Sequence, residues 1–178
     1  TYDALIHLFF ADHYAENWFE PWDYRWYTGF TVMSYPPLVH QAMALFSFLG
    51  GLKFGLYAVA FLGIILFITG VYRFSHMLLG NRRIAGYAAL LAVCSSTFIE
   101  TLHLFGQLPS IIGLSVLLHA LPEIYLWLTT GRYRYLFTSL SLIAVTVTSH
   151  HVTPIFGMVF FIFPLIGMAV MDRANEES

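Results

Sequence analysis

Long runs of hydrophobic residues dominate the chain after its first third. Each run approaches the ~20 apolar residues that a helix needs to cross the hydrocarbon core of a bilayer, although two of them need flanking residues to reach that length. An isolated strand cannot satisfy its backbone hydrogen bonds in lipid, so helices are the expected form. The pattern predicts an all-α, polytopic transmembrane bundle over residues 54–178. The expected spans are residues 54–79, 84–102, 108–129, 135–151 and 152–171.

The first 53 residues follow a different pattern, and we expect them to form a separate extracytoplasmic segment, 1–53. Residues 1–36 hold five of the ten acidic residues and three of the four tryptophans. Amphipathic rings beside carboxylates suit the interface between membrane and water. The pattern predicts a helix over 3–18, a loop over 19–36, and an interfacial helix over 38–49 that stops at Gly50 and Gly51. That last helix is too short to span a bilayer.

Composition excludes several classes of protein. Hydrophobic residues make up 58% of the chain and charged residues 10%, whereas soluble domains carry about 25% charged residues. The net charge of −2 gives no footprint for nucleic acid. Cys94 is the single cysteine, so neither a disulfide framework nor a cysteine metal site is expected. The chain begins with Thr1 and lacks the features of a signal peptide, so we expect a processed chain or a fragment of a longer one.

Arginines predict the orientation of the bundle. They follow the first, third and fifth expected spans, at Arg73, Arg82, Arg83, Arg132, Arg134 and Arg173. The junctions over 100–107 and 149–154 carry no Lys or Arg. Basic residues stay on the cytoplasmic side, so 73–83, 130–135 and 172–178 are predicted to be cytoplasmic and 1–53 extracytoplasmic. We therefore expect a multi-pass protein of the inner (cytoplasmic) membrane.

This orientation gathers titratable side chains on the outer side, where such a cluster is a candidate site. Asp3 and His7 are four residues apart and share a face of the expected helix. Ser96, Glu100, His103 and Gln107 belong to one expected helical stripe, with Gly106 as a candidate break. The whole outer set is Asp3, His7, Asp12, His13, Glu16, His40, Glu100, His103, Gln107, His150 and His151.

These features also have purely structural interpretations. Asp3 and His7 would suit a solvated helix face, and the other outer histidines would suit helix ends at the headgroup level. Trp26 and Tyr35 are either anchors at the membrane interface or platforms on which a sugar stacks. Glu123, near the cytoplasmic end of the third span, is expected to pair with Arg132 or Arg134.

Three segments resemble the start of a polytopic glycosyltransferase of the GT-C superfamily. They are TYDALIHLFFADHYAENWFEPWDYRWYTGFTVMSYPPLVHQ, RFSHMLLGNRRIAGYAALLA and HLFGQLPS. They fall within residues 1–110 and are most similar to bacterial membrane proteins described as related to 6-pyruvoyl-tetrahydropterin synthase, a label that implies no pterin chemistry. Asp3 matches the family's acidic residue in the first outer loop. Pro36, Pro37 and Leu38 match its juxtamembrane element, and Gly80, Asn81 and Arg82 match its inner turn.

The resemblance implies a chemistry. Such enzymes transfer a sugar from a polyprenyl-phosphate donor to a lipid, glycan or protein acceptor at the outer surface. Asp3 would be the catalytic base, with His7 as its helix neighbour, or the ligand of a divalent metal (Mg or Mn) in metal-dependent members. The candidate substrate-binding residues are His103, Gln107, His150, His151, Trp26 and Tyr35. Cations that could hold the phosphate are scarce on the outer side, where only Arg25 and Lys53 lie.

Two other functions fit the sequence. The chain would also serve as a non-catalytic transmembrane subunit of a larger respiratory or photosynthetic complex, its seventeen phenylalanines packing against partner helices, lipid or pigment. Alternatively, His103 and His150 (or His151) would supply the two imidazoles of a haem site. The expected partners are therefore the lipid bilayer, a lipid-linked sugar donor and other membrane proteins, with no nucleic acid.

Overall fold

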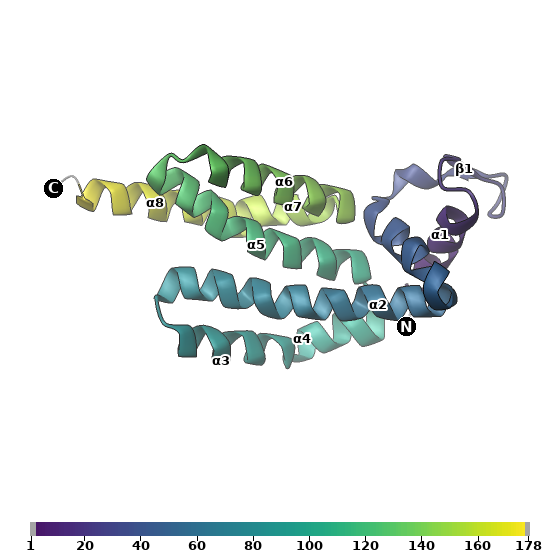
Figure 1. The fold of residues 1–178 in the computed structure, drawn as a ribbon, viewed down its shortest axis with the longest axis horizontal. Coiled ribbons are helices and arrows are strands. Elements are labelled where there is room, and N and C mark those ends of the chain that lie inside the picture. The colour runs from purple at the N-terminus through teal and green to yellow at the C-terminus, as the bar shows by residue number, and fades with distance from the viewer. Residues whose placement is uncertain (1–2, 177–178) are drawn as a thin grey trace.

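The computed structural model describes residues 3–176, which fold into helices joined by short turns (Figure 1). The α-helices are α1 (Ala4–Glu16), α2 (Leu38–Leu79), α3 (Arg82–Val93), α4 (Ser96–Ile99), α5 (Leu108–Thr130), α6 (Tyr133–Ser149), α7 (Val152–Gly157) and α8 (Phe163–Glu176). The π-helical turns η2 (Glu100–Phe105) and η3 (Met158–Ile162) continue α4 and α7, and the 3-10 turn η1 (Val32–Ser34) precedes α2. A two-residue hairpin of β1 (Trp22–Asp23) and β2 (Phe30–Thr31) interrupts the predicted loop. The predicted all-α fold is confirmed.

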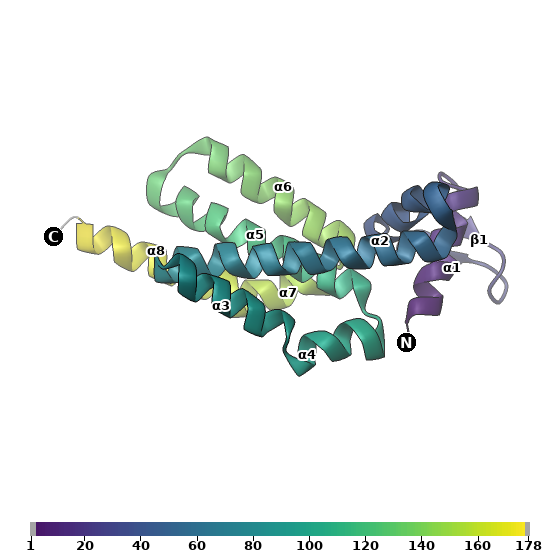
Figure 2. The same ribbon diagram turned by 60° about the horizontal axis from the view of Figure 1, so that its bottom comes forward.

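Helix α5 occupies the centre of the bundle. It packs against α2 and α6, and α7 and α8 also contact it (Figure 1 and Figure 2). Helix α3 returns alongside α2 rather than against α5. At the other end of the chain, α1 packs on the first turns of α2.

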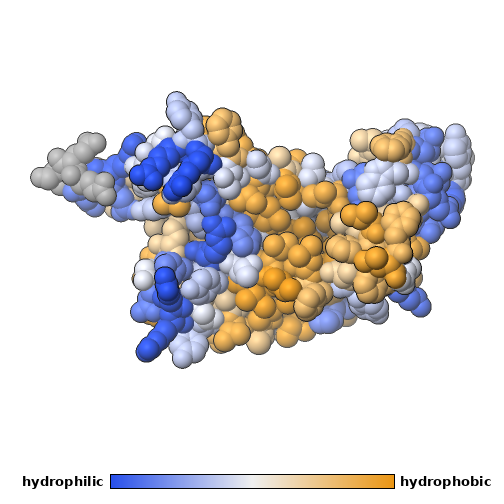
Figure 3. Space-filling view, in the orientation of Figure 1, coloured by the Kyte–Doolittle hydropathy of each residue, from blue (hydrophilic) through white to orange (hydrophobic). Residues whose placement is uncertain are grey.

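Three helical segments are long and apolar enough to cross a membrane: α2, α5 and the run Val152–Asn175 through α7, η3 and α8. Helix α3, together with α4 and η2, would form a fourth span with a bend of 49°. Figure 3 shows an apolar band across the middle of the molecule, between two more hydrophilic ends. By length and composition the chain is therefore a multi-pass membrane protein in contact with a bilayer.

The turns gather at two opposite ends of the bundle. The α2–α3 turn, the α5–α6 turn and the end of α8 lie at one end, whereas α1 and the hairpin lie at the other (Figure 1). The first of these ends carries the arginines of the turns, which are Arg82, Arg83, Arg132, Arg134 and Arg173. The fold thus places the arginines of the turns at the end of the bundle opposite α1, as the arginine pattern predicts.

Helix α2 breaks at its paired glycines, where the sequence predicts the end of the interfacial helix. Gly50 and Gly51 have non-helical backbone angles, and the φ of Gly51 is 82°, a region that glycine adopts readily. Residues 38–49, before the break, form a short leg of α2. This short leg packs back against the long leg that follows the break. A Cβ at Gly55 would lie 2.2 Å from the carbonyl oxygen of Met43. Only a residue without a side chain allows so close an approach.

An ion pair and a histidine join α2 to α5. Arg73 Nη2 lies 2.6 Å from Glu123 Oε1, and Arg73 Nη1 lies 3.1 Å from His119 Nδ1. The expectation that Glu123 pairs with Arg132 or Arg134 is therefore wrong. The packing of α2 on α5 brings Arg73 to Glu123, although the two residues are 50 positions apart in the sequence. Ionisable groups in membrane-spanning helices usually pair with one another inside the bundle.

The expected stripe from Ser96 to Gln107 is not continuous. Ser95 caps α4 by accepting a hydrogen bond from the Phe98 N–H, at 3.3 Å. The chain then winds as the π-helical η2, whose wider turn changes the spacing of its side chains. Gly106 ends η2 in the left-handed conformation, with φ at 71°. The prediction of one stripe is wrong, and Gly106 is the break that the sequence indicated.

Charged side chains fasten the loop after α1 to that helix. Buried Asp23 lies 2.8 Å from Arg25 Nη2 and 3.1 Å from His13 Nδ1. Arg25 also pairs with Asp12 and lies over the ring of Phe9, 4.7 Å from its centroid. Hydrogen bonds from Arg25 hold the pKa of Asp23 below its usual range. The loop is therefore fixed to α1 at several points.

The fold-back of α2 predicts a large effect of Gly55→Ala. The added methyl group would meet the Met43 backbone, which cannot move without separating the two legs. We expect the free energy of unfolding to fall by about 1–3 kcal/mol, measured by thermal unfolding in detergent. Gly86→Ala is the matched control, because nothing lies within 4 Å of a Cβ there. Equal stability of the two variants would contradict the fold-back.

Candidate functional site

Four imidazoles and one phenol meet at the end of the bundle that carries α1. We call these residues, His7, Tyr35, His40, His150 and His151, the histidine cluster. The ring centroid of Tyr35 lies 5.5 Å from that of His40, 6.2 Å from that of His151 and 6.4 Å from that of His7. The two consecutive histidines of the α6–α7 junction have centroids 5.9 Å apart. The cluster thus joins α1, the start of α2 and the α6–α7 junction.

His7 and His40 form a buried hydrogen-bonded pair. Nδ1 of His7 lies 2.9 Å from Nε2 of His40, and the residues are 4% and 1% exposed. A neutral imidazole has one donor and one acceptor nitrogen, so one proton lies in this bond. The backbone carbonyl of Gly106 also lies beside the His7 ring.

Helical spacing explains why these two rings meet. The buried side of α1 presents His7, Phe10, Ala11, His13 and Tyr14, and four of these follow the i, i+3, i+4, i+7 pattern of one helix face. The first turns of α2 bury Val39, His40, Met43 and Ala44 in return. Phe10 lies beside the pair, with its ring centroid 5.0 Å from that of His40. Both histidines therefore lie on the faces of α1 and α2 that are buried against each other.

Burial determines the charge of His7. It lowers the pKa of His7 to about 4, and the Asp3 carboxylate and the Gly106 carbonyl offset only part of this effect. His7 is therefore neutral near pH 7. The Asp3 N–H donates to the Phe105 carbonyl oxygen at 2.9 Å, which holds the start of α1 beside the end of η2. Asp3 thus lies near a neutral imidazole rather than a cation.

The remaining members of the cluster differ in their environments. His150 Nδ1 lies 2.8 Å from the Thr153 hydroxyl, and its Nε2 lies 3.4 Å from the Ser110 hydroxyl. His151 is exposed. Burial, together with Asp3, raises the pKa of Tyr35. The phenol therefore keeps its proton and can donate a hydrogen bond to a ligand.

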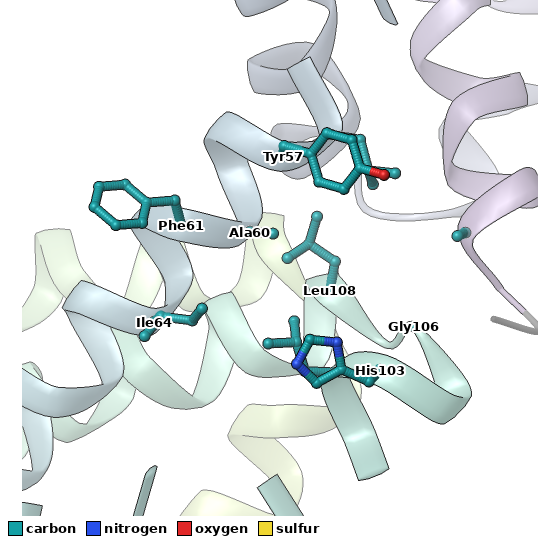
Figure 4. Close-up of a pocket in the computed structure, with 10 residues that line it drawn as sticks. Tyr57, Ala60, Phe61, Ile64, His103, Gly106 and Leu108 are labelled. Carbon is teal, nitrogen blue, oxygen red and sulfur yellow. The ribbon is translucent and has the colours of Figure 1, made fainter. Parts of the chain in front are cut away.

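An apolar groove of about 320 Å³ begins next to Asp3 (Figure 4). Ala4, the residue after Asp3, lines one end of it, together with Gly106. Tyr57 and Phe61 of α2 line one wall, and His103 lies across from them on η2. The groove therefore runs from the start of α1 along the apolar side of α2.

The structure brings together some of the predicted site residues and separates others. Asp3, His7, Tyr35, His150 and His151 lie in or beside the histidine cluster. His103 lies in the groove instead, and Gln107 is exposed after η2. Trp26 packs with the rings of Phe9, Tyr27 and Phe30 on the loop, away from these histidines.

No site with three or more metal ligands is assembled among the described residues. Within that part of the chain, no three His, Cys, Asp or Glu side chains are arranged to hold a metal ion. His103 and Leu108 line the groove, whereas His150 contacts Ser110 and lies against Gly113 on another side of α5. The two imidazoles of the haem hypothesis thus face different surroundings.

His40 is the member of the cluster that sequence reasoning left unranked. It belongs to the outer set, but neither its neighbours in sequence nor its spacing mark it as the partner of His7. The usable signal is that Pro36 and Pro37 place the start of a helix just before it. His40 then lies one turn inside that helix, between the apolar Val39 and Met43.

Comparisons with known proteins assign no family to this geometry. A scan against protein-family models found no match, and neither the curated proteins nor the solved structures gave one. The resemblance of residues 1–110 to GT-C glycosyltransferases therefore remains an expectation from the sequence.

The buried state of His7 predicts a loss of stability on acidification. Its pKa is about 4 in the folded protein and 6.5 in the unfolded chain, so the unfolded chain binds more protons between these values. The stability is fully present above pH 6.5 and is lost as the pH falls toward 4. We expect the thermal midpoint in detergent to fall across this window, and to fall less in His7→Gln. His103→Gln, at an exposed site, should keep the full dependence, and an unchanged slope in His7→Gln would argue against the assignment.

Proposed function

We propose that the protein is a membrane glycosyltransferase of the GT-C type, which moves a sugar from a polyprenyl-phosphate donor to an acceptor at the outer face of the membrane. The observation that carries the proposal is the position of Asp3, which lies beside His7 and next to the end of the apolar groove. A carboxylate at the mouth of an apolar groove suits a substrate with a polar head and a lipid tail. The resemblance of residues 1–110 supports the same assignment.

The groove suits the isoprenoid chain of the donor. Its walls are apolar apart from His103 and Tyr57, and Tyr57 and Phe61 are 71% and 65% exposed on the side of α2. A chain leaving the bilayer could therefore enter the groove from the side. Its phosphate would then reach the region of His103, Gly106 and Asp3.

The proposed reaction is a direct displacement. Asp3 takes the proton of the acceptor hydroxyl, and that oxygen attacks the anomeric carbon of the donor sugar. The bond from the anomeric carbon to the phosphate oxygen breaks, and polyprenyl phosphate leaves. Arg25 is engaged with Asp12 and Asp23, so the His103 ring, which lines the groove, would hold the phosphate by hydrogen bonding.

We further propose that five segments cross the membrane, with residues 1–53 outside and 172–178 in the cytoplasm. Helix α6, with 17 residues, is the shortest of them. The long leg of α2, the bent α3–η2 pair, α5 and the α7–α8 run supply the other four. The clustering of turn arginines at one end of the bundle supports this orientation.

A carboxylate that acts as base predicts a large kinetic effect of Asp3→Asn. We expect sugar transfer by the full-length protein to fall by roughly 10²–10⁴-fold, with unchanged helix content and thermal midpoint. Transfer of a radiolabelled sugar from polyprenyl phosphate in membranes is the measurement. Glu16→Gln is the matched control, since Glu16 is an exposed carboxylate on the same helix. Normal turnover by Asp3→Asn would remove Asp3 from the mechanism.

The orientation predicts which residues a membrane-impermeant maleimide can reach. In a Cys94→Ser background, Tyr24→Cys should react in intact cells, and Tyr133→Cys should react only after permeabilisation. The two positions are 77% and 73% exposed, so accessibility within the protein does not separate them. The opposite pattern would place Asp3 on the cytoplasmic side.

A second candidate function is a transmembrane subunit of a larger complex. The observation in its favour is the large apolar surface of the run Val152–Asn175. Only 17% of the most apolar 18-residue stretch in this run is buried inside the protein. Phe156 and Phe160 stack on each other there, with ring centroids 6.3 Å apart, and both are exposed. Partner helices, lipid or pigment would cover such a surface.

A further inference from the structure

A separate small pocket lies on the loop side of α1. Its volume is about 220 Å³, and it is distinct from both the groove and the histidine cluster. Three of its walls are the rings of Tyr14, Trp18 and Phe19. Polar groups come from Glu20 and Gln41. We call it the aromatic pocket.

Local hydrogen bonds hold the walls of the aromatic pocket in place. Helix α1 ends at Glu16, and Trp18 turns back so that its ring meets that of Tyr14 edge to face, at 6.3 Å. The carbonyl oxygen of Glu20 accepts a hydrogen bond from His13 Nε2 at 2.7 Å. The Glu20 carboxylate accepts another from the Trp22 N–H at 3.1 Å. The pocket is therefore built before any ligand enters.

The inner wall of the aromatic pocket carries an unpartnered polar atom. Tyr14 is 3% exposed, and its hydroxyl has no hydrogen-bond partner among the described residues. Burial also raises the pKa of Tyr14, so the hydroxyl remains a donor. Buried hydroxyl groups normally find a partner in the protein or in bound molecules. A ligand that reaches the base of the pocket would supply it.

We propose that the aromatic pocket binds one pyranose ring of a carbohydrate, as a subsite for a glycan acceptor. Ring faces carry negative potential and attract the polarised C–H groups of a sugar, while the carboxylate of Glu20 and the amide of Gln41 bond its hydroxyls. Aromatic walls with a few placed polar groups are typical of small-molecule sites. The acceptor role rests on the proposed transferase function, whereas carbohydrate binding itself does not.

The position of the aromatic pocket connects it to the histidine cluster. Tyr14 follows His7 by seven residues on the same buried face of α1, about 10 Å along the helix. Gln41 follows His40 directly on α2. A glycan that places one ring in the aromatic pocket would extend over the outside of this buried contact toward Asp3. The subsite would therefore orient an acceptor chain rather than take part in the chemistry.

The surroundings favour a carbohydrate over a lipid headgroup. Trp18, Phe19 and Glu20 belong to the segment between α1 and β1. These two elements lie at one end of the molecule (Figure 1), and that end is more hydrophilic than the apolar band across the middle (Figure 3). Tyr14 from α1 and Gln41 from α2 both line the pocket, and its volume of about 220 Å³ suits a single ring better than a lipid chain. Anchoring of Trp18 in the bilayer is the competing role, and the experiment below separates the two.

Saturation-transfer NMR with cellobiose, chitobiose and mannobiose tests the proposal. The full chain is held in a phosphocholine detergent, because detergents with sugar headgroups would compete. We expect signals from at least one disaccharide, and a loss of affinity of about tenfold or more in Trp18→Ala. Trp18→Phe should retain most of the affinity, which shows that the fold is intact. Trp22→Ala is the matched control, because Trp22 has similar exposure but its side chain does not line the pocket, and this variant should bind normally.

The outcomes distinguish this proposal from the proposed function. Binding that depends on Trp18 supports the subsite even if Asp3→Asn leaves transfer unchanged. Equal binding by Trp18→Ala, or no binding of any of the three disaccharides, overturns it. Strong quenching of Trp18 fluorescence by brominated lipid would also overturn it, because the residue would then be a membrane anchor.

Discussion

The fold-back of α2 is the constraint on which the outer end of the protein depends. A continuous helix from Leu38 onward would carry its first turns away from the rest of the bundle. The break at Gly50 and Gly51, with Gly55 against Met43, turns those turns back instead. They then offer an apolar face on which α1 packs. Without this geometry His40 would not be buried, and His7 would have no partner.

Charged side chains hold the loop after α1 in place, because helix packing does not fix this loop. The loop after α1 has little hydrophobic core of its own, and charge pairs compensate for this. Asp23 is buried and bonded to both His13 and Arg25, so removing either partner would leave a desolvated carboxylate. The same anchoring positions Glu20 and Trp18 at the aromatic pocket. Electrostatic pairs thus shape the loop, whereas hydrophobic burial shapes the helices.

The sequence predicts the helices and their ends better than the contacts between them. Runs of apolar residues, arginines at alternate junctions and paired glycines are local signals, and they identify the all-α fold, the two ends of the bundle and the break in α2. The His7–His40 pair and the Arg73–Glu123 pair join residues 33 and 50 positions apart. They depend on how helices rotate against one another, which one sequence does not specify. The π-helical η2 escaped prediction for a related reason, since its residues would form an ordinary α-helix by propensity alone.

The proposed function requires an apolar binding site and a polar binding site near one carboxylate. A lipid-linked donor and a water-soluble acceptor have to meet at one carboxylate, although each prefers a different solvent. The apolar groove beside Ala4 opens on the lipid side of α2, and the aromatic pocket lies among polar loop residues. Asp3 and the neutral His7 lie near the junction of α1 with η2, close to the groove. An imidazole that stays uncharged there leaves Asp3 without a fixed counter-ion. The burial that lowers the pKa of His7 would therefore leave the Asp3 carboxylate open to the hydroxyl of an acceptor.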